Sequence, residues 1–115
     1  MSIDKSLITG STTTLILKLL EEKDMYGYEM IETLSKKSDH TFDLKAGTLY
    51  PILHGLEKKD FVKSYEKRAD NERIRKYYSL TPKGKGFLKE KHKEWTDFSK
   101  AVNKVLGGGL SYEYT

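Results

Sequence analysis

The chain has 115 residues and a mass of 13.3 kDa, the size of one ordinary domain, which excludes a multidomain organisation. It has no cysteine, which excludes disulfides, thiolate metal sites and a cysteine nucleophile. The histidines His40, His54 and His92 do not have the spacing of a ligand pair, and we expect neither metal nor cofactor. No apolar run approaches the roughly 20 residues that span a bilayer, and no signal-like segment follows the start. We therefore expect a soluble cytoplasmic protein with no membrane partner.

The net charge of +4 is unevenly distributed along the chain. Residues 1–44 carry five Lys against eight Asp and Glu, a balance of −3, whereas residues 45–115 carry 16 Lys and Arg against nine acids, a balance of +7. All the arginines, Arg68, Arg73 and Arg75, fall within eight positions, and the planar fork of Arg suits phosphate and guanine edges. The second part of the chain is therefore expected to favour a polyanion, although a solvated charged loop is the alternative.

The first two predicted helices are both apolar. In the first, the leucines and Ile16 between Leu15 and Leu20 occupy two sides, so we expect this helix to contact two partners and to end near Lys23. Asp24 is the expected N-cap of a second helix running from Tyr26 to about Lys37. Gly27 lies in the apolar stripe of that helix, which predicts the close approach of another helix.

A very short strand is predicted at residues 41–44, followed by a helix from Lys45 to Lys59. Its core stripe is Leu49, Ile52, Leu53 and Leu56, and the opposite face carries Gly47, Pro51, His54 and Lys58, flanked by Thr48 and Tyr50. This outer face is small near its start and basic towards its end.

Two strand-like segments, 61–66 and 73–80, predict a β-hairpin with a long polar tip. Thr81 and Pro82 then give the N-cap and first-turn signature of a final helix that ends near Leu106. Its apolar positions alternate at spacings of three and four with one lysine interruption, which is coiled-coil periodicity and predicts pairing with a second copy of the chain. They are Leu88, Lys91, Trp95, Phe98, Val102 and Val105.

This order of elements is that of a winged helix-turn-helix, so the predicted fold is mainly α with a small antiparallel β-wing and a long C-terminal dimerisation helix. We expect a DNA-binding domain at residues 1–80, a dimerisation helix at 81–106 and a flexible tail at 107–115. A helix with a polar outer face enters the major groove while a basic hairpin contacts the flanking backbone. The predicted DNA contacts are therefore Lys45, Thr48, Tyr50 and His54 on or beside the helix face, and Lys67, Arg68, Arg73 and Arg75 in the wing.

Three segments carry a family resemblance: Tyr26 to Met30, Gly47 to Leu53 followed by Leu56 and Glu57, and Arg75 to Thr81 followed by Gly84. In this order and spacing they resemble the PadR family of bacterial transcriptional regulators, in its short branch with a single terminal helix. The resemblance implies a dimeric repressor in which Thr48 and Tyr50 contact DNA, with Tyr50 as a core-edge aromatic being the alternative. Tyr26 and Tyr28 are expected to pack beside the helix-turn-helix. Of Tyr77 and Tyr78, one is expected in the core.

The resemblance also bears on Trp95, Gly55 and Asp60. Multidrug-responsive members of the short branch stack planar apolar compounds on a tryptophan of the terminal helix, which would assign such a ligand site to Trp95 and Phe98. The alternative is that both rings only fill the dimer interface. The family usually has Arg where this chain has Gly55, and often Gly where it has Asp60, a residue that tolerates left-handed backbone less easily.

Other functional classes find little support in the sequence. We expect no enzyme, because no Ser, His and acid cluster is indicated and Gly84-Lys85-Gly86 is better interpreted as the first turn of the final helix than as a phosphate loop. A winged-helix module that binds a protein has no need of clustered arginines, but stays an alternative. An anionic-surface binder would need a broader apolar face than the final helix offers.

Overall fold

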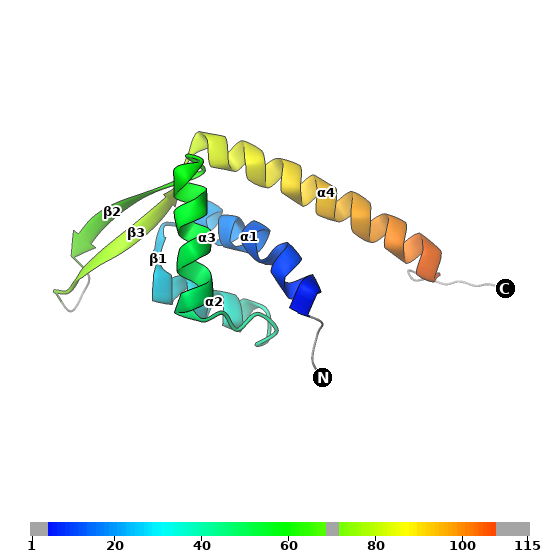
Figure 1. The fold of residues 1–115 in the computed structure, drawn as a ribbon, viewed down its shortest axis with the longest axis horizontal. Coiled ribbons are helices and arrows are strands. Elements are labelled where there is room, and N and C mark those ends of the chain that lie inside the picture. Colours follow the sequence, from blue (N-terminus) through cyan, green and yellow to red (C-terminus); the bar gives the residue numbers. More distant parts are fainter. Residues whose placement is uncertain (1–4, 69–71, 108–115) are drawn as a thin grey trace.

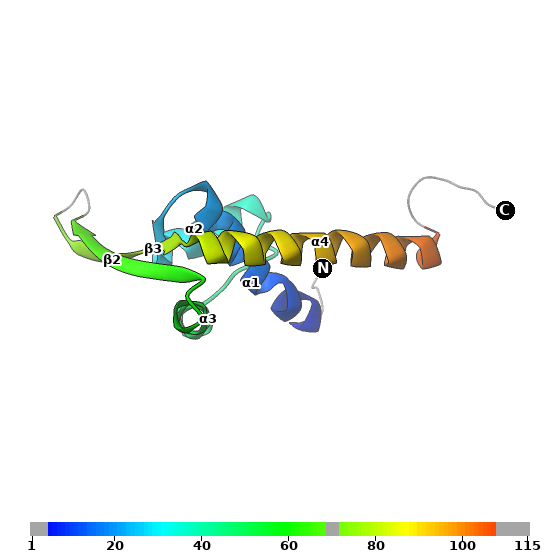
Figure 2. The same ribbon diagram turned by 90° about the horizontal axis from the view of Figure 1, so that it is seen from above.

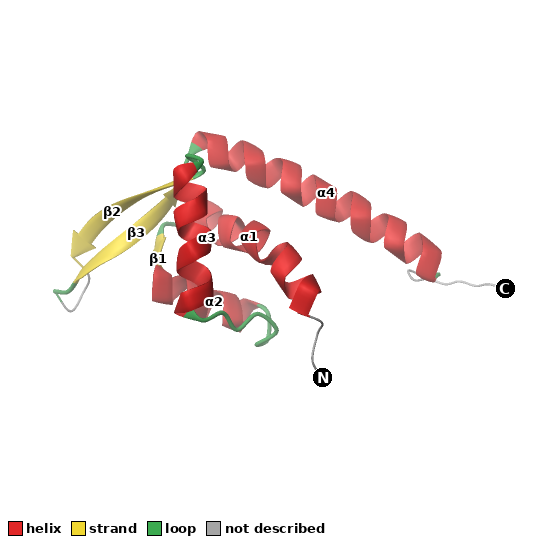
Figure 3. Cartoon of the chain, in the orientation of Figure 1, coloured by secondary structure: helices red, strands yellow, loops and turns green. Residues whose placement is uncertain are grey.

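The computed structural model describes residues 5–68 and 72–107, which form four helices and a three-stranded antiparallel sheet (Figures 1 and 3). This confirms the predicted fold class. In chain order the elements are α1 (Lys5–Glu22), β1 (Met25–Tyr26), α2 (Gly27–Lys37), α3 (Ala46–Lys58), β2 (Val62–Arg68), β3 (Ile74–Leu80) and α4 (Pro82–Leu106). The expected tail at 107–115 lies, apart from Gly107, outside the described residues.

Helix α1 is at the centre of the core, as its two apolar sides predict. Ile16, Leu17, Leu19 and Leu20 are all buried, and the helix packs against α2, β3 and α4. Thr12 is also buried, and its hydroxyl donates a hydrogen bond to the carbonyl of Ile8, 2.6 Å away. The polar group is thereby satisfied within the helix itself.

The connections around α2 differ from the prediction in two places. Asp24 is not an N-cap, because Met25 and Tyr26 form the short strand β1 and α2 begins only at Gly27, with no side-chain cap. Residues 41–44 form no strand, so the expected strand is wrong and the third strand of the sheet is β1. Phe42 and Leu44 are nevertheless partly buried against the core, although their segment pairs with no strand of the sheet.

The sheet has the order β1-β3-β2 and two chemically different faces. On the core-side face, Val62 pairs with Leu80 and Ser64 with the buried Tyr78, and the face continues to the outer pairs of the hairpin, Glu66 with Lys76 and Arg68 with Ile74. The opposite face, here called the tyrosine face, carries the pairs Lys63 with Ser79, Tyr65 with Tyr77 and Lys67 with Arg75. Because successive side chains of a strand alternate, the register assigns each wing cation to one face.

Helix α4 begins as predicted. The Thr81 hydroxyl accepts a hydrogen bond from the amide of Gly84 at 2.9 Å, and Pro82 occupies the first turn. Gly84 is buried directly against the carbonyl of Phe61 and the side chain of Leu80, while Leu88 completes the contact with the core. Beyond this point α4 extends past the N-terminal start of α1 (Figure 1), and the described part of the molecule measures 62 × 32 × 21 Å.

Substitution of two glycines in the first turns of α4 is predicted to have opposite effects on stability. A Cβ on Gly84 would overlap the backbone of Phe61, whereas Gly86 has nothing within 4 Å of the corresponding position. We expect Gly84→Ala to lower the free energy of unfolding by about 1–3 kcal/mol through overpacking. Gly86→Ala should raise it by about 0.5–1 kcal/mol, because alanine loses less backbone freedom in a helix. Urea unfolding followed by circular dichroism measures both, and equal effects of the two variants would contradict the close packing at Gly84.

Candidate nucleic-acid interface

Helix α3 has one buried face and one exposed face, as its sequence predicts. Leu49, Leu53 and Leu56 are buried in the core. Gly47, Thr48, Pro51, His54 and Lys58 are exposed. Figure 2 shows α3 at the edge of the molecule, with α2, α4 and the sheet on one side of it. The exposed face of α3 is therefore accessible to a large partner.

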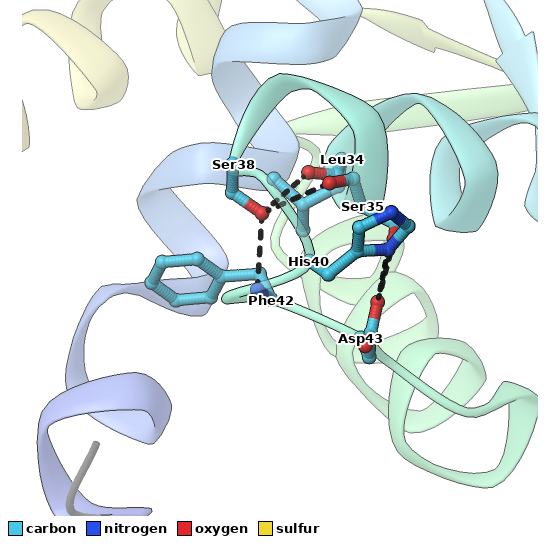
Figure 4. Close-up of polar contacts among 6 residues, drawn as sticks. All are labelled: Leu34, Ser35, Ser38, His40, Phe42 and Asp43. Carbon is cyan, nitrogen blue, oxygen red and sulfur yellow. Dashed lines mark hydrogen bonds and ion pairs between the residues drawn. The ribbon is translucent and has the colours of Figure 1, made fainter. Parts of the chain in front are cut away.

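The turn between α2 and α3 fixes the start of α3 (Figure 4). The Ser38 hydroxyl donates to the carbonyl of Leu34 at 2.7 Å and accepts from the amide of Phe42 at 3.0 Å. The Ser35 hydroxyl donates to Asp43 at 2.5 Å and lies 2.8 Å from Nδ1 of His40. These bonds bridge the turn, whose residues Asp39 and His40 have positive φ.

Ser35, His40 and Asp43 are the residue types of a hydrolase triad, but their arrangement is different. In a triad the histidine bridges serine and acid, whereas here the serine bridges the other two, and Nδ1 of His40 faces both partners. The His40 side chain is also largely exposed to solvent. The cluster therefore stabilises the turn and offers no activated nucleophile.

Of the residues predicted on α3, three are exposed and one is half-buried. Lys45, Thr48 and His54 are exposed, and Lys45 is the N-cap residue of the helix. Tyr50 is half-buried, with its ring against Gly27 of α2 and 6.4 Å from the His54 ring. This confirms the close approach predicted at Gly27, since any Cβ there would overlap the Tyr50 ring. Tyr50 therefore joins α3 to α2 and leaves His54 as the outward aromatic group.

The two departures from the family pattern lie at the end of α3. Asp60 has a φ of 64°, so it takes the left-handed conformation that glycine adopts most easily. Gly55 is exposed with nothing within 4 Å of its Cβ position, and it lies in a shallow open hollow together with His54, Glu57 and Lys58. The missing side chain thus leaves space on the outer surface of α3.

The predicted wing cations are divided between the two faces of the hairpin. Arg68 lies on the core-side face, exposed, with its guanidinium 3.2 Å from the carbonyl of Glu72. Lys67 and Arg75 lie on the tyrosine face, where Arg75 is half-buried over the ring of Tyr26. Arg73 is exposed next to the tip. The fold brings all four cations together at one end of the molecule, as expected, but the strand register places them on different faces of the hairpin.

Comparison with known proteins identifies the family to which the chain belongs. Residues 16–90 match the Transcriptional regulator PadR-like family. The chain belongs to this family. It is 34% identical over 106 residues to a protein of Lysinibacillus sphaericus, covering 92% of this chain and 97% of that one. The structure resembles that of a transcriptional regulator from Clostridium thermocellum, with a TM-score of 0.80, 38% identity and coverage of 89% and 96% of the two chains. A PadR-like regulator from Bacillus cereus superimposes with a TM-score of 0.81 at 30% identity, covering 91% and 100%.

Membership of the PadR family identifies the protein as a transcriptional regulator with a DNA-binding winged helix, and not as an enzyme. None of the helices in the described ranges combines the length and apolarity that a membrane crossing requires. Within the same ranges no three acidic or histidine side chains are grouped so that they could hold a metal ion.

The predicted apolar positions of the terminal helix of this PadR protein differ in their exposure along the helix. Trp95 is 53% exposed and Phe98 is 58% exposed, with their rings tilted and 6.2 Å apart. Val105 and Leu106, near the end of α4, are still more exposed. Leu88, by contrast, is buried against the helix-turn-helix. The apolar stripe of α4 thus packs on its own chain at one end and is open at the other.

Sequence reasoning missed several residues of the wing and its base. Tyr28 is 63% exposed, so its expected packing is wrong, whereas Tyr26 is half-buried and Tyr78 is the core member of its pair, as predicted. Lys76, exposed beside Arg68 on the core-side face, and Tyr65 on the other face were not recognised. The alternation of the strands could have indicated them, but only with the cross-strand register, which depends on where the hairpin turns.

Proposed function

We propose that the protein is a homodimeric repressor that binds an inverted-repeat operator. The observation that carries this proposal is the exposed face of α3, small at Gly47 and Thr48 and basic at Lys58, beside a hairpin that carries all the arginines. Helices of this type insert their first residues into the major groove, and paired subunits contact grooves one turn, about 34 Å, apart. Residues 1–80 would form the DNA-binding unit and residues 81–106 the dimerisation helix.

The proposed DNA contacts divide into base-edge and backbone contacts. Thr48 and His54 project from α3 towards base edges, with Tyr50 beside them and Lys45 at the helix start close to a phosphate. In the wing, Lys67, Arg68, Arg73 and Arg75 provide positive charge for the flanking backbone. Each phosphate neutralised by such a cation releases counterions, which makes affinity fall with salt.

DNA binding is tested by fluorescence anisotropy with a duplex from upstream of the protein's own gene and a scrambled duplex of the same composition. We expect selective binding whose logarithmic affinity falls steeply with the logarithm of salt concentration. Arg68→Ala should weaken binding and make the salt slope shallower by about 0.9, the loss of one phosphate contact. Lys93→Ala on α4, which removes an equally exposed cation far from the wing, is the control and should leave the slope unchanged.

Equal, weak binding to both duplexes would contradict the proposal. A winged-helix module that binds another protein is the alternative function, and it would show no selectivity and no effect of Arg68→Ala. The basic wing favours DNA over this alternative, since a protein partner gives no reason for clustered arginines.

The homodimer is proposed from the open apolar face of α4. Trp95, Phe98, Val105 and Leu106 are exposed in the single chain, and Leu7 of α1 is 60% exposed as well. Because the stripe alternates at spacings of three and four, it is complementary to an identical helix lying along it. A second copy also provides the two-fold symmetry that an inverted repeat requires.

Phe98→Glu is predicted to disrupt this dimer, because it introduces a charge in the middle of the apolar stripe. Sedimentation equilibrium should show the mass of a dimer for the native protein and a shift towards the monomer for the variant. Lys100→Glu, on the opposite side of α4, is the matched control and should remain dimeric. A native protein that sediments as a monomer at micromolar concentration would contradict the dimer.

We propose further that a small planar aromatic ligand at the dimer interface releases the repressor from DNA. The support is the pair of exposed rings, Trp95 and Phe98, which would face their counterparts across the two-fold axis. Such a ligand must bind the free dimer more tightly than the DNA-bound dimer, because equal affinity for both shifts no equilibrium. A repressor without a ligand, whose rings only fill the interface, is the alternative.

Trp95 is the one tryptophan of the chain, so its fluorescence reports this site directly. Titration with a small panel of planar aromatic cations should quench its emission saturably, because the ligand stacks on the indole ring. The Phe98→Glu variant should lose saturable quenching, and free tryptophan amide corrects for absorption by the ligand. Absence of saturable quenching by every compound of the panel would favour the ligand-independent repressor.

A further inference from the structure

The tyrosine face of the wing is a closed stack of aromatic rings. Tyr65 and Tyr77 are direct cross-strand partners, and their rings lie nearly parallel with centroids 5.8 Å apart. Tyr26 of β1 meets Tyr77 edge to face at 5.4 Å. The stack therefore joins all three strands of the sheet on one side.

Two wing cations are held on this stack. The Arg75 guanidinium lies 4.4 Å from the centroid of the Tyr26 ring, and the Lys67 ammonium lies 5.4 Å from that of Tyr77. Cations at these distances are attracted to the ring face. On the core-side face the Lys76 ammonium likewise lies 5.6 Å from the centroid of the Tyr78 ring, and the Arg68 guanidinium donates to the carbonyl of Glu72. Arg68 and Lys76 are nevertheless exposed, whereas Arg75 is half-buried on the tyrosine face.

A hydrogen bond of Tyr65 attaches the hairpin part of this stack to the loop that follows α1. The Tyr65 hydroxyl donates to Oδ2 of Asp24 at 2.6 Å, and Asp24 lies in the turn between α1 and β1, outside the hairpin. This bond, together with burial and the nearby carboxylate, raises the pKa of Tyr65 to about 12, so the hydroxyl remains a donor throughout the physiological range. On the other face, the Ser64 hydroxyl donates to Glu57 of α3 at 2.7 Å.

We propose that Tyr65 and Asp24 are positioning residues for operator binding, which hold the wing at the angle that brings Arg68 and Lys76 alongside the DNA bound by α3. The inference rests on the proposed DNA-binding function. Besides its pairing with β1 and the buried side chains of Val62 and Tyr78, the hairpin is attached by one hydrogen bond on each face, through Ser64 and through Tyr65. Loss of the Tyr65 bond leaves the tyrosine face held by the β1 pairing and the contact of Tyr26 with Tyr77, so the outer end of the wing changes its direction without unfolding.

Tyr65→Phe tests this with the loss of a single hydroxyl, because the stacked ring is kept. We expect operator affinity about 5- to 20-fold weaker and a salt slope shallower by about 1–2, since the wing loses phosphate contacts. Asp24→Ala should give the same change, and the double variant should be no weaker than either single one. Asp24→Asn retains an acceptor oxygen and should restore most of the affinity.

The sign of the Asp24→Ala effect separates positioning from simple electrostatics. Removing a negative charge near a DNA-binding surface should by itself strengthen binding to a polyanion, whereas the proposal requires weaker binding. Asp97→Ala on α4 is the control for loss of one aspartate charge far from the wing and should leave affinity and slope unchanged. Circular dichroism and thermal unfolding of each variant establish that the fold is retained.

Several outcomes would overturn the proposal while leaving the repressor function intact. The first is an unchanged operator affinity and salt slope in Tyr65→Phe, and the second is weaker binding by this variant with an unchanged slope. The third is native binding by Asp24→Ala together with weaker binding by Tyr65→Phe, which would indicate that the hydroxyl contacts DNA directly. If the native protein itself binds no duplex selectively, the proposed function fails, and the positioning role fails with it.

Discussion

The rest of the structure depends on the contact between Phe61 and the start of α4. The Thr81 amide donates to the carbonyl of Phe61 at 3.1 Å, the Thr81 hydroxyl donates to the carbonyl of Asp60 at 2.6 Å, and Gly84 packs on the same backbone. The rings of Phe61 and Phe87 stack at 4.2 Å. The end of α3, the start of β2, the end of β3 and the start of α4 all meet here. No side chain larger than hydrogen fits at Gly84, so these elements keep one mutual arrangement.

In this protein the face on which each charged side chain lies matters as much as the number of charges. The excess of +7 in residues 45–115 favours the binding of a polyanion by the second part of the chain. The sheet register then divides the wing cations between two faces: Arg75 is half-buried on the Tyr26 ring, whereas Arg68 and Lys76 are exposed on the core-side face. The same pairing that builds the hairpin thus decides which face of the wing each cation occupies.

Elements with strong periodicity could be predicted from the sequence, and short ones could not. The stripes of α3 and α4 and the Thr81 cap each determine a helix locally, and the structure confirms them within a residue or two. Strand β1 has two residues, and it exists only because β3 offers an edge beside it. No local pattern distinguishes β1 from residues 41–44. The apolar side chains of that segment alternate equally well, but the segment pairs with none of the three strands of the sheet. Tyr65 was missed for the same reason, since its partner Asp24 is 41 positions away.

The junction at Phe61 also determines how a signal in the proposed dimer could reach DNA. The ligand proposed beside Trp95 would lie far along α4 from the helix-turn-helix and would make no contact with α3. Because Thr81 at the start of α4 is hydrogen-bonded to Asp60 just beyond the end of α3, rotation of α4 about the axis of the proposed dimer would carry α3 with it. The spacing of the two α3 helices would have to match one turn of DNA, so a small change in the angle between subunits would be amplified over the length of α4 into a mismatch with the operator. Control of DNA binding by a ligand on α4 would therefore depend on the rigidity of the junction at Phe61 and not on flexibility along α4.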